Sequence, residues 1–122
     1  MWLFGSDRRR EERLTVGWMG ALRCTFPDLE ETLQAAVVNA SRGGALLNID
    51  RLQIGAHHLV ISDETPRLEL EIAFSGGPFK TEVEIRWYDQ IEEDRNFAVG
   101  VQFKALSKES LALLKEALKN PD

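Results

Sequence analysis

The sequence predicts a mainly β protein, built as a small antiparallel β-barrel or sandwich with one C-terminal helix. Alternation of apolar and polar residues recurs in six or seven segments before residue 105, and each is typical of a strand with one buried face. The period changes to that of a helix only after Ser107. The 122 residues, 43% of them apolar and 29% charged, suit one domain with its own core.

The N-terminal half predicts an arm followed by three strands. Residues 1–13 show no hydrophobic period, so we expect an extended or mobile arm. A strand over residues 14–26 follows, because its apolar residues share one parity: Leu14, Val16, Trp18, Leu22, Cys24 and Phe26. After a turn at Pro27 and Asp28, a second strand is predicted over residues 31–39. It ends at the string NASRGG, and a short third strand covers residues 45–49.

The C-terminal half predicts further strands and the helix. The weaker pattern after residue 50 favours a strand near residues 57–61, and DETP at 63–66 is predicted to be a loop. Three clear alternating segments follow, each with one polar and one apolar face: residues 67–74, 79–87 and 97–104. Ser107 can cap a helix over residues 107–119, in which Leu111, Leu114 and Leu118 share a face.

Composition narrows the class of protein. A net charge of −5 argues against non-specific coating of nucleic acid, which requires a broad basic face. The single cysteine, Cys24, cannot form an internal disulfide and indicates a reducing compartment. The apolar start MWLF precedes the arginines, which is the reverse of a signal peptide, and no run approaches the roughly 18 apolar residues of a membrane helix. We therefore expect a cytoplasmic protein without membrane insertion.

The sequence shows no constellation of catalytic or metal-binding residues. His57 and His58 are adjacent on a predicted strand, so they point to opposite faces and are poorly placed to chelate one metal. Neither a nucleophile elbow nor a GxxxxGK[ST] loop is present. The glutamates lie on the polar parity of strands, which is typical of a solvated face, and Cys24 on an apolar parity is predicted to be core. We expect no enzyme, no metal and no cofactor.

The string RRREER at residues 8–13 is the first candidate for binding. Arg9 and Arg13 are four residues apart, with Arg8 and Arg10 beside them. An arginine fork matches a phosphate bidentately, matches the O6/N7 edge of guanine, and can stack on a base. Such a segment suits a small phosphate compound that carries guanine, although an arginine run alone is more often a solvated basic arm.

The string NASRGG is the second candidate. Asn39 and Ser41 are two residues apart, so both side chains can face one side of a strand end and offer donors and acceptors to a base edge. Gly43 and Gly44 permit a sharp turn and a close approach of the backbone to a ligand. Alone, the string is equally consistent with a plain tight turn.

Together, the two strings resemble the signature of the PilZ domain family, RxxxR followed by [D/N]xSxxG. Here the first motif is Arg9 and Arg13, and the second is Asn39, Ser41 and Gly44. The resemblance continues through GALL after the glycines, EIRW at 84–87, AVGVQF at 98–103 and the leucine-rich helix. It covers residues 8–119.

The resemblance implies a six-stranded antiparallel barrel that binds the bacterial second messenger cyclic di-GMP. Arg9 and Arg13 would contact phosphates and guanine edges, Asn39 and Ser41 would read a guanine, and Gly44 would permit close approach.

Further contacts follow from the same resemblance. Arg8 and Arg10 match extra arginines of members that hold two stacked ligand molecules. Gly43 and Trp87 are additional candidates, and Trp87 equally suits core packing on the apolar parity of its strand.

The resemblance also implies a switch rather than catalysis. The arm (residues 1–13) would reorder on the barrel (residues 14–122) when ligand binds, and so pass the signal to an unidentified effector protein. One alternative is a PilZ-fold adaptor that binds no nucleotide and acts only through protein contacts. A nucleic-acid-binding barrel is a further alternative, disfavoured because few aromatics interleave with the arginines.

Overall fold

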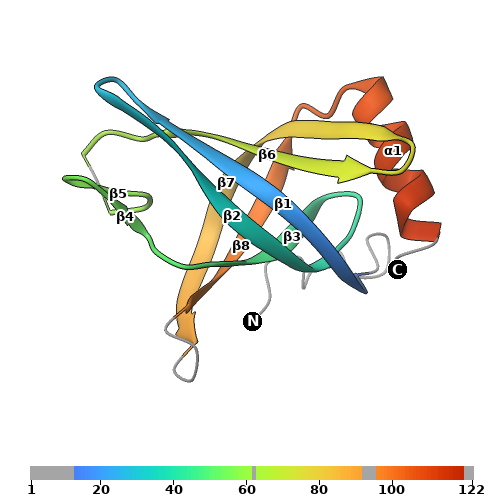
Figure 1. The fold of residues 1–122 in the computed structure, drawn as a ribbon, viewed down its shortest axis with the longest axis horizontal. Coiled ribbons are helices and arrows are strands. Elements are labelled where there is room, and N and C mark those ends of the chain that lie inside the picture. The colour runs from blue at the N-terminus through green and yellow to red at the C-terminus, as the bar shows by residue number, and fades with distance from the viewer. Residues whose placement is uncertain (1–12, 62, 92–95, 120–122) are drawn as a thin grey trace.

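Six long strands form a closed antiparallel ring, and one helix follows them (Figure 1). The computed structural model describes residues 13–61, 63–91 and 96–119. The order of strands around the ring is β1-β2-β3-β8-β7-β6. The long strands are β1 (Leu14–Phe26), β2 (Leu29–Ala40), β3 (Gly44–Ile49), β6 (Arg67–Phe74), β7 (Gly77–Ile91) and β8 (Asn96–Lys104). The predicted fold class is therefore confirmed.

The segment between β3 and β6 differs from the prediction. In place of a strand over residues 57–61, it holds a two-stranded hairpin of β4 (Gln53–Ile54) and β5 (His57–His58). Gly55, with φ of 60°, makes the turn. The N–H of Leu59 still donates to the carbonyl oxygen of Leu52 at 2.8 Å, but beyond it the N–H groups of Val60 and Ile61 both donate to Nδ1 of His58 at 3.0 Å. These local hydrogen bonds end the strand early.

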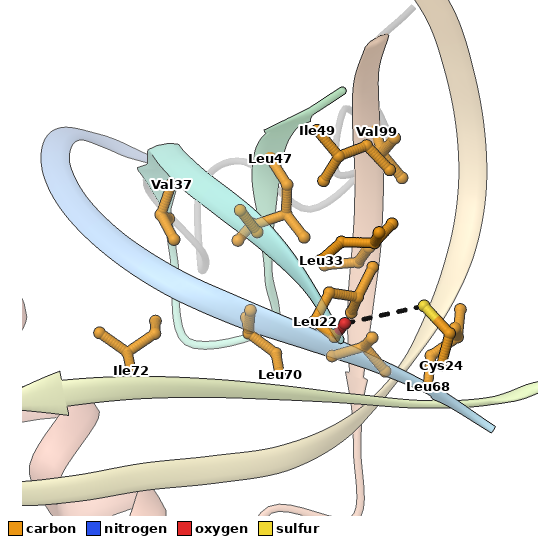
Figure 2. Packing of buried hydrophobic residues seen from close by; sticks show 14 of the residues in the cluster. Leu22, Cys24, Leu33, Val37, Leu47, Ile49, Leu68, Leu70, Ile72 and Val99 are labelled. Carbon is orange, nitrogen blue, oxygen red and sulfur yellow. Dashed lines mark hydrogen bonds between the residues drawn. The ribbon is translucent and has the colours of Figure 1, made fainter. Parts of the chain in front are cut away.

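Apolar side chains from the six long strands fill the ring (Figure 2). In β3, for example, Ala45, Leu47 and Ile49 are buried, whereas Leu46 and Asn48 between them are partly exposed. Cys24 lies within this core, where its thiol donates to the carbonyl oxygen of Leu22 at 3.7 Å. Its predicted core position is confirmed.

The helix α1 (Lys108–Lys119) packs on β7. Its N-terminus is capped as expected, because the Ser107 hydroxyl accepts a hydrogen bond from the Ser110 N–H at 3.0 Å. The Ser110 hydroxyl in turn donates to the carbonyl oxygen of Lys80 in β7 at 2.9 Å. Leu114 of this helix is fully buried. No helix in the described part of the chain has the length and apolar character to span a bilayer.

Candidate functional site

The NASRGG turn joins β2 to β3, and hydrogen bonds within the turn and to β8 fix its shape. Ser41 is fully buried, and its hydroxyl oxygen accepts a hydrogen bond from the Gly43 N–H at 3.1 Å. The Ser41 N–H donates to the carbonyl oxygen of Gly44 at 2.9 Å. The carbonyl oxygen of Gly43 accepts from the N–H of Phe103 in β8 at 2.8 Å. The Ser41 hydroxyl therefore shapes the turn, while its own proton remains available to a partner.

A bulge in β2 turns Asn39 to the outer face of the ring. Val37 pairs with the buried Leu47, but the register shifts by one residue before Asn39, which pairs with Leu46. Such a bulge moves the following side chains to the opposite face. The Oδ1 atom of Asn39 is nonetheless buried, and none of the described residues donates a hydrogen bond to it. An unmet buried acceptor costs about 1–3 kcal/mol, which makes Oδ1 of Asn39 a candidate acceptor for a donor outside the described residues.

A second bulge places Trp87 outside the ring rather than in phase with the core. Ile85 pairs with the buried Val101, and the register then shifts so that Trp87 pairs with Gly100. A Cβ atom at Gly100 would lie 2.5 Å from Nε1 of Trp87, so the indole lies directly over Gly100. The alternation of apolar residues in β7 made core packing the alternative role for Trp87. The structure instead places its indole on the outer face, over Gly100.

These two bulges align one row of neighbours across five strands. Each residue in the row pairs with the next: Thr15, Asn39, Leu46, Gly100 and Trp87. The acceptor of Asn39 and the indole of Trp87 thus lie on one outer face, although they are far apart in the sequence.

Arg13 lies at the edge of this face. It directly precedes β1, whose first residue Leu14 pairs with Ala40, so Arg13 and Ser41 flank the same pair. Arg8, Arg9 and Arg10, and with them most of the expected arm, lie outside the described residues. The structure thus places Arg13 next to the NASRGG turn, with Trp87 farther along the same outer face.

Two residues that sequence reasoning did not name lie beside the site. Gln102 pairs with Gly44, and its Oε1 accepts a hydrogen bond from Nη1 of Arg86 at 3.2 Å. Arg86 also lies 3.6 Å from the carboxylate of Glu84. Both side chains are exposed on the polar parity of their strands, a position that gives no sequence signal of its own.

A separate cluster forms around His57, where the sequence indicated none. Its Nε2 lies 2.7 Å from Oδ1 of Asp28 and its Nδ1 lies 3.8 Å from Oε1 of Glu64. One ligand atom from each of the three residues lies within 4.8 Å of the others. The imidazole also stacks on Phe26 at 4.2 Å. These contacts hold the β4–β5 hairpin against the turn between β1 and β2, and we assign them this structural role.

Comparisons with known proteins identify relatives of the fold. The model of the PilZ domain matches residues 7–120. Among solved structures, YcgR from Escherichia coli in complex with c-di-GMP aligns over 92% of this chain with a TM-score of 0.62 and 18% identity. The K. pneumonia MrkH–c-di-GMP complex aligns over 93% with a TM-score of 0.64 and 16% identity. The isolated PilZ domain of YcgR with c-di-GMP aligns over 93% with a TM-score of 0.57 and 15% identity.

The extent of these matches differs among the relatives. The chain spans 45% of the YcgR structure and 52% of the MrkH structure, but 96% of the isolated YcgR domain. No curated protein gives a significant match.

Proposed function

Because this chain belongs to the PilZ domain family of non-enzymatic cyclic di-GMP receptors, we propose that it binds cyclic di-GMP on the outer face described above. The buried Oδ1 of Asn39, which no described residue satisfies, is the single observation that carries this proposal. The exocyclic amino group of guanine is a donor that such an acceptor requires.

The neighbouring groups complement the rest of the ligand. Cyclic di-GMP carries two phosphates and two guanines, so it requires cations and base-edge partners together. Arg9 and Arg13 supply guanidinium groups for the phosphates and guanine edges, and Ser41 supplies its remaining hydroxyl proton. The Trp87 indole provides an apolar surface against which a guanine base can pack, and Gly44 lets the backbone approach the ligand closely. Arg8 and Arg10 would serve a second stacked molecule.

Binding acts as a switch in this proposal. The arm, residues 1–13, reorders on the barrel when its arginines engage the ligand, and an unidentified effector protein recognises the change. We place this signalling in the cytoplasm, because a reducing compartment suits a chain whose one cysteine is an unpaired, buried thiol.

Calorimetric titration with cyclic di-GMP tests the site. Removing one partner of a desolvated charge pair typically costs roughly 2–5 kcal/mol, so Arg13→Ala should bind at least about thirtyfold more weakly than wild type. Asn39→Ala should also weaken binding, because Oδ1 is lost. Arg67→Ala is the matched control, since Arg67 lies at the start of β6, away from the NASRGG turn.

Two results would contradict the proposal. Equal affinities of Arg13→Ala and Arg67→Ala for cyclic di-GMP would show that Arg13 of the RxxxR motif does not contribute to binding. No heat with wild type, together with an unchanged melting temperature, would favour the alternative in which the fold is a protein-contact adaptor without a nucleotide.

A further inference from the structure

β7 extends well beyond the strand that pairs with one of its edges. Its pairing with β6 ends at Leu68 and Val83, whereas its pairing with β8 continues to Ile91 and Asn96. Residues 84–91 are therefore paired with β8 alone among the described strands, as the lower half of β7 in Figure 1 illustrates. An unpaired strand edge presents N–H and C=O groups in the pattern that another strand requires.

A groove of about 650 Å³ lies at the start of this edge, where Glu84 and Ile85 are the two edge residues that line it. Leu59, Val60 and Pro66 line one side, and Glu84 and Ile85 of β7 line the other. One residue of an added strand fills roughly 160 Å³, from a rise of about 3.3 Å, a strand spacing of about 4.8 Å and a layer thickness of about 10 Å. The groove therefore has room for about four residues of extended chain.

Two consecutive apolar residues at this groove are exposed: Val60 lines the groove, and Ile61 follows Val60 in the chain. Val60 is 42% exposed and Ile61 is 70% exposed, which is unusual for adjacent large aliphatic residues. Their two N–H groups are fixed by Nδ1 of His58, so this exposure belongs to an ordered loop rather than a fraying one. An ordered apolar rim is typical of a contact surface.

The charges of the groove leave one cation uncommitted. Lys104 lies 3.8 Å from the carboxylate of Glu82, and Glu84 lies 3.6 Å from Arg86. Arg67, also in the groove, is exposed and forms no ion pair with any described residue. In a chain of net charge −5, this single positive site selects for a carboxylate.

We propose that the effector docks an extended segment into this groove by β-strand addition at the start of the free edge of β7, beginning at Glu84. Alternate backbone groups of the segment pair with the β7 edge, apolar side chains cover Val60 and Ile61, and an acidic side chain meets Arg67. The inference rests on the proposed function, because it names the docking site of the effector. The same stretch of β7 carries Trp87, so the docking edge and the proposed ligand face share one strand.

Random linear peptides displayed on phage provide the probe for this docking edge. Peptides are selected on the full chain and counter-selected on Ile61→Asp, and the survivors are synthesised and titrated by calorimetry. We expect survivors with alternating apolar residues and at least one Asp or Glu. Ile61→Asp should weaken their binding at least about tenfold and Arg67→Ala severalfold, because apolar cover and an ion pair are lost. Met19→Asp is the control, since Met19 of β1 is 56% exposed and neither it nor its chain neighbours line the groove.

Backbone methylation distinguishes strand addition from other modes of docking. N-methylation of alternate peptide amides, in the phase that faces β7, should abolish binding, whereas methylation in the other phase should not. Failure to recover peptides that survive counter-selection, or binding that is indifferent to methylation in both phases, would overturn the inference. Cyclic di-GMP titration separates the two proposals. If wild type binds the nucleotide but yields no such peptide, the docking edge alone is contradicted, whereas Ile61→Asp should lose the peptide and keep its nucleotide affinity.

Discussion

Gly100 has the least freedom to change among the residues of the candidate site. A Cβ atom there would lie 2.5 Å from Nε1 and 2.9 Å from two carbons of the Trp87 indole. Gly100→Ala should therefore displace the indole, lower the free energy of unfolding by about 1–3 kcal/mol, and weaken cyclic di-GMP binding. Urea unfolding and calorimetry measure the two effects. Gly17→Ala is the matched control, because no described residue other than its two chain neighbours has an atom within 4 Å of the added Cβ. Equal behaviour of the two variants would contradict the packing of Trp87 on Gly100.

Cys24 makes stability depend on alkaline pH. Burial, and secondarily the carboxylate of Glu31, raises the pKa of its thiol from 9.0 to about 12. As pH rises, the unfolded chain therefore loses the thiol proton before the folded chain does. The contribution of Cys24 to the free energy of unfolding is complete below pH 9 and is lost as pH rises toward 12. Between pH 8 and pH 10, wild type should lose about 1.4 kcal/mol more free energy of unfolding than Cys24→Ala. Urea unfolding of both proteins at the two pH values measures this difference, and parallel losses would contradict it.

At the scale of the elements, the strands were predictable and their bulges were not. Alternation located every long strand, because one face of each packs in the core while the other meets solvent. The bulges beside Asn39 and before Trp87 change that phase within a strand. In the sequence the bulges occur in the strings VVN and IRW. Neither string carries a residue pattern that distinguishes a bulge from a regular strand. Periodicity therefore could not predict the outer row of the candidate site, although the resemblance named two of its members, Asn39 and Trp87, as candidate ligand contacts.

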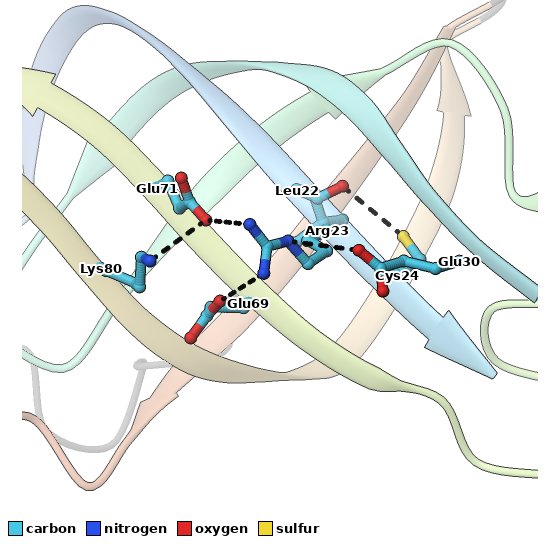
Figure 3. Close-up of polar contacts among 7 residues, drawn as sticks. All are labelled: Leu22, Arg23, Cys24, Glu30, Glu69, Glu71 and Lys80. Carbon is cyan, nitrogen blue, oxygen red and sulfur yellow. Dashed lines mark hydrogen bonds and ion pairs between the residues drawn. The ribbon is translucent and has the colours of Figure 1, made fainter. Parts of the chain in front are cut away.

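The outer surface of the neighbouring strands shows a similar limit. Arg23 of β1 lies among three carboxylates, at 3.7 Å from Glu30, 3.8 Å from Glu69 and 3.2 Å from Glu71 (Figure 3). Lys80 of β7 also reaches Glu71, at 3.7 Å. The sequence predicted that these glutamates form a solvated face. It did not give the cross-strand register that turns them into a network spanning four strands, because register depends on turns and bulges.

At the scale of the whole molecule, binding should be visible as global stabilisation. A ligand at one hundred times its Kd adds about 2.7 kcal/mol to the free energy of unfolding. For a domain of this size that corresponds to a rise in Tm on the order of 10 °C. The same variants that weaken binding should lose this rise, whereas Ile61→Asp should keep it, because Ile61 is not part of the outer row that holds Asn39 and Trp87.

In the proposed switch, reordering of the arm is the step that would connect ligand to effector, and limited proteolysis tests it. Trypsin cleaves after Arg8, Arg9, Arg10 and Arg13, which the ligand would cover directly, so protection there reports contact. Chymotrypsin cleaves after Trp2 and Phe4, which the ligand is not expected to touch, so protection there reports ordering of the arm. At one hundred times the Kd, cleavage at both sets should slow by up to about a hundredfold if only the unliganded form is cut. Arg13→Ala is the control, in which the same ligand concentration should protect much less. Protection confined to the arginines would mean that the ligand is held without any reordering, and the signal would then have to leave through the barrel itself.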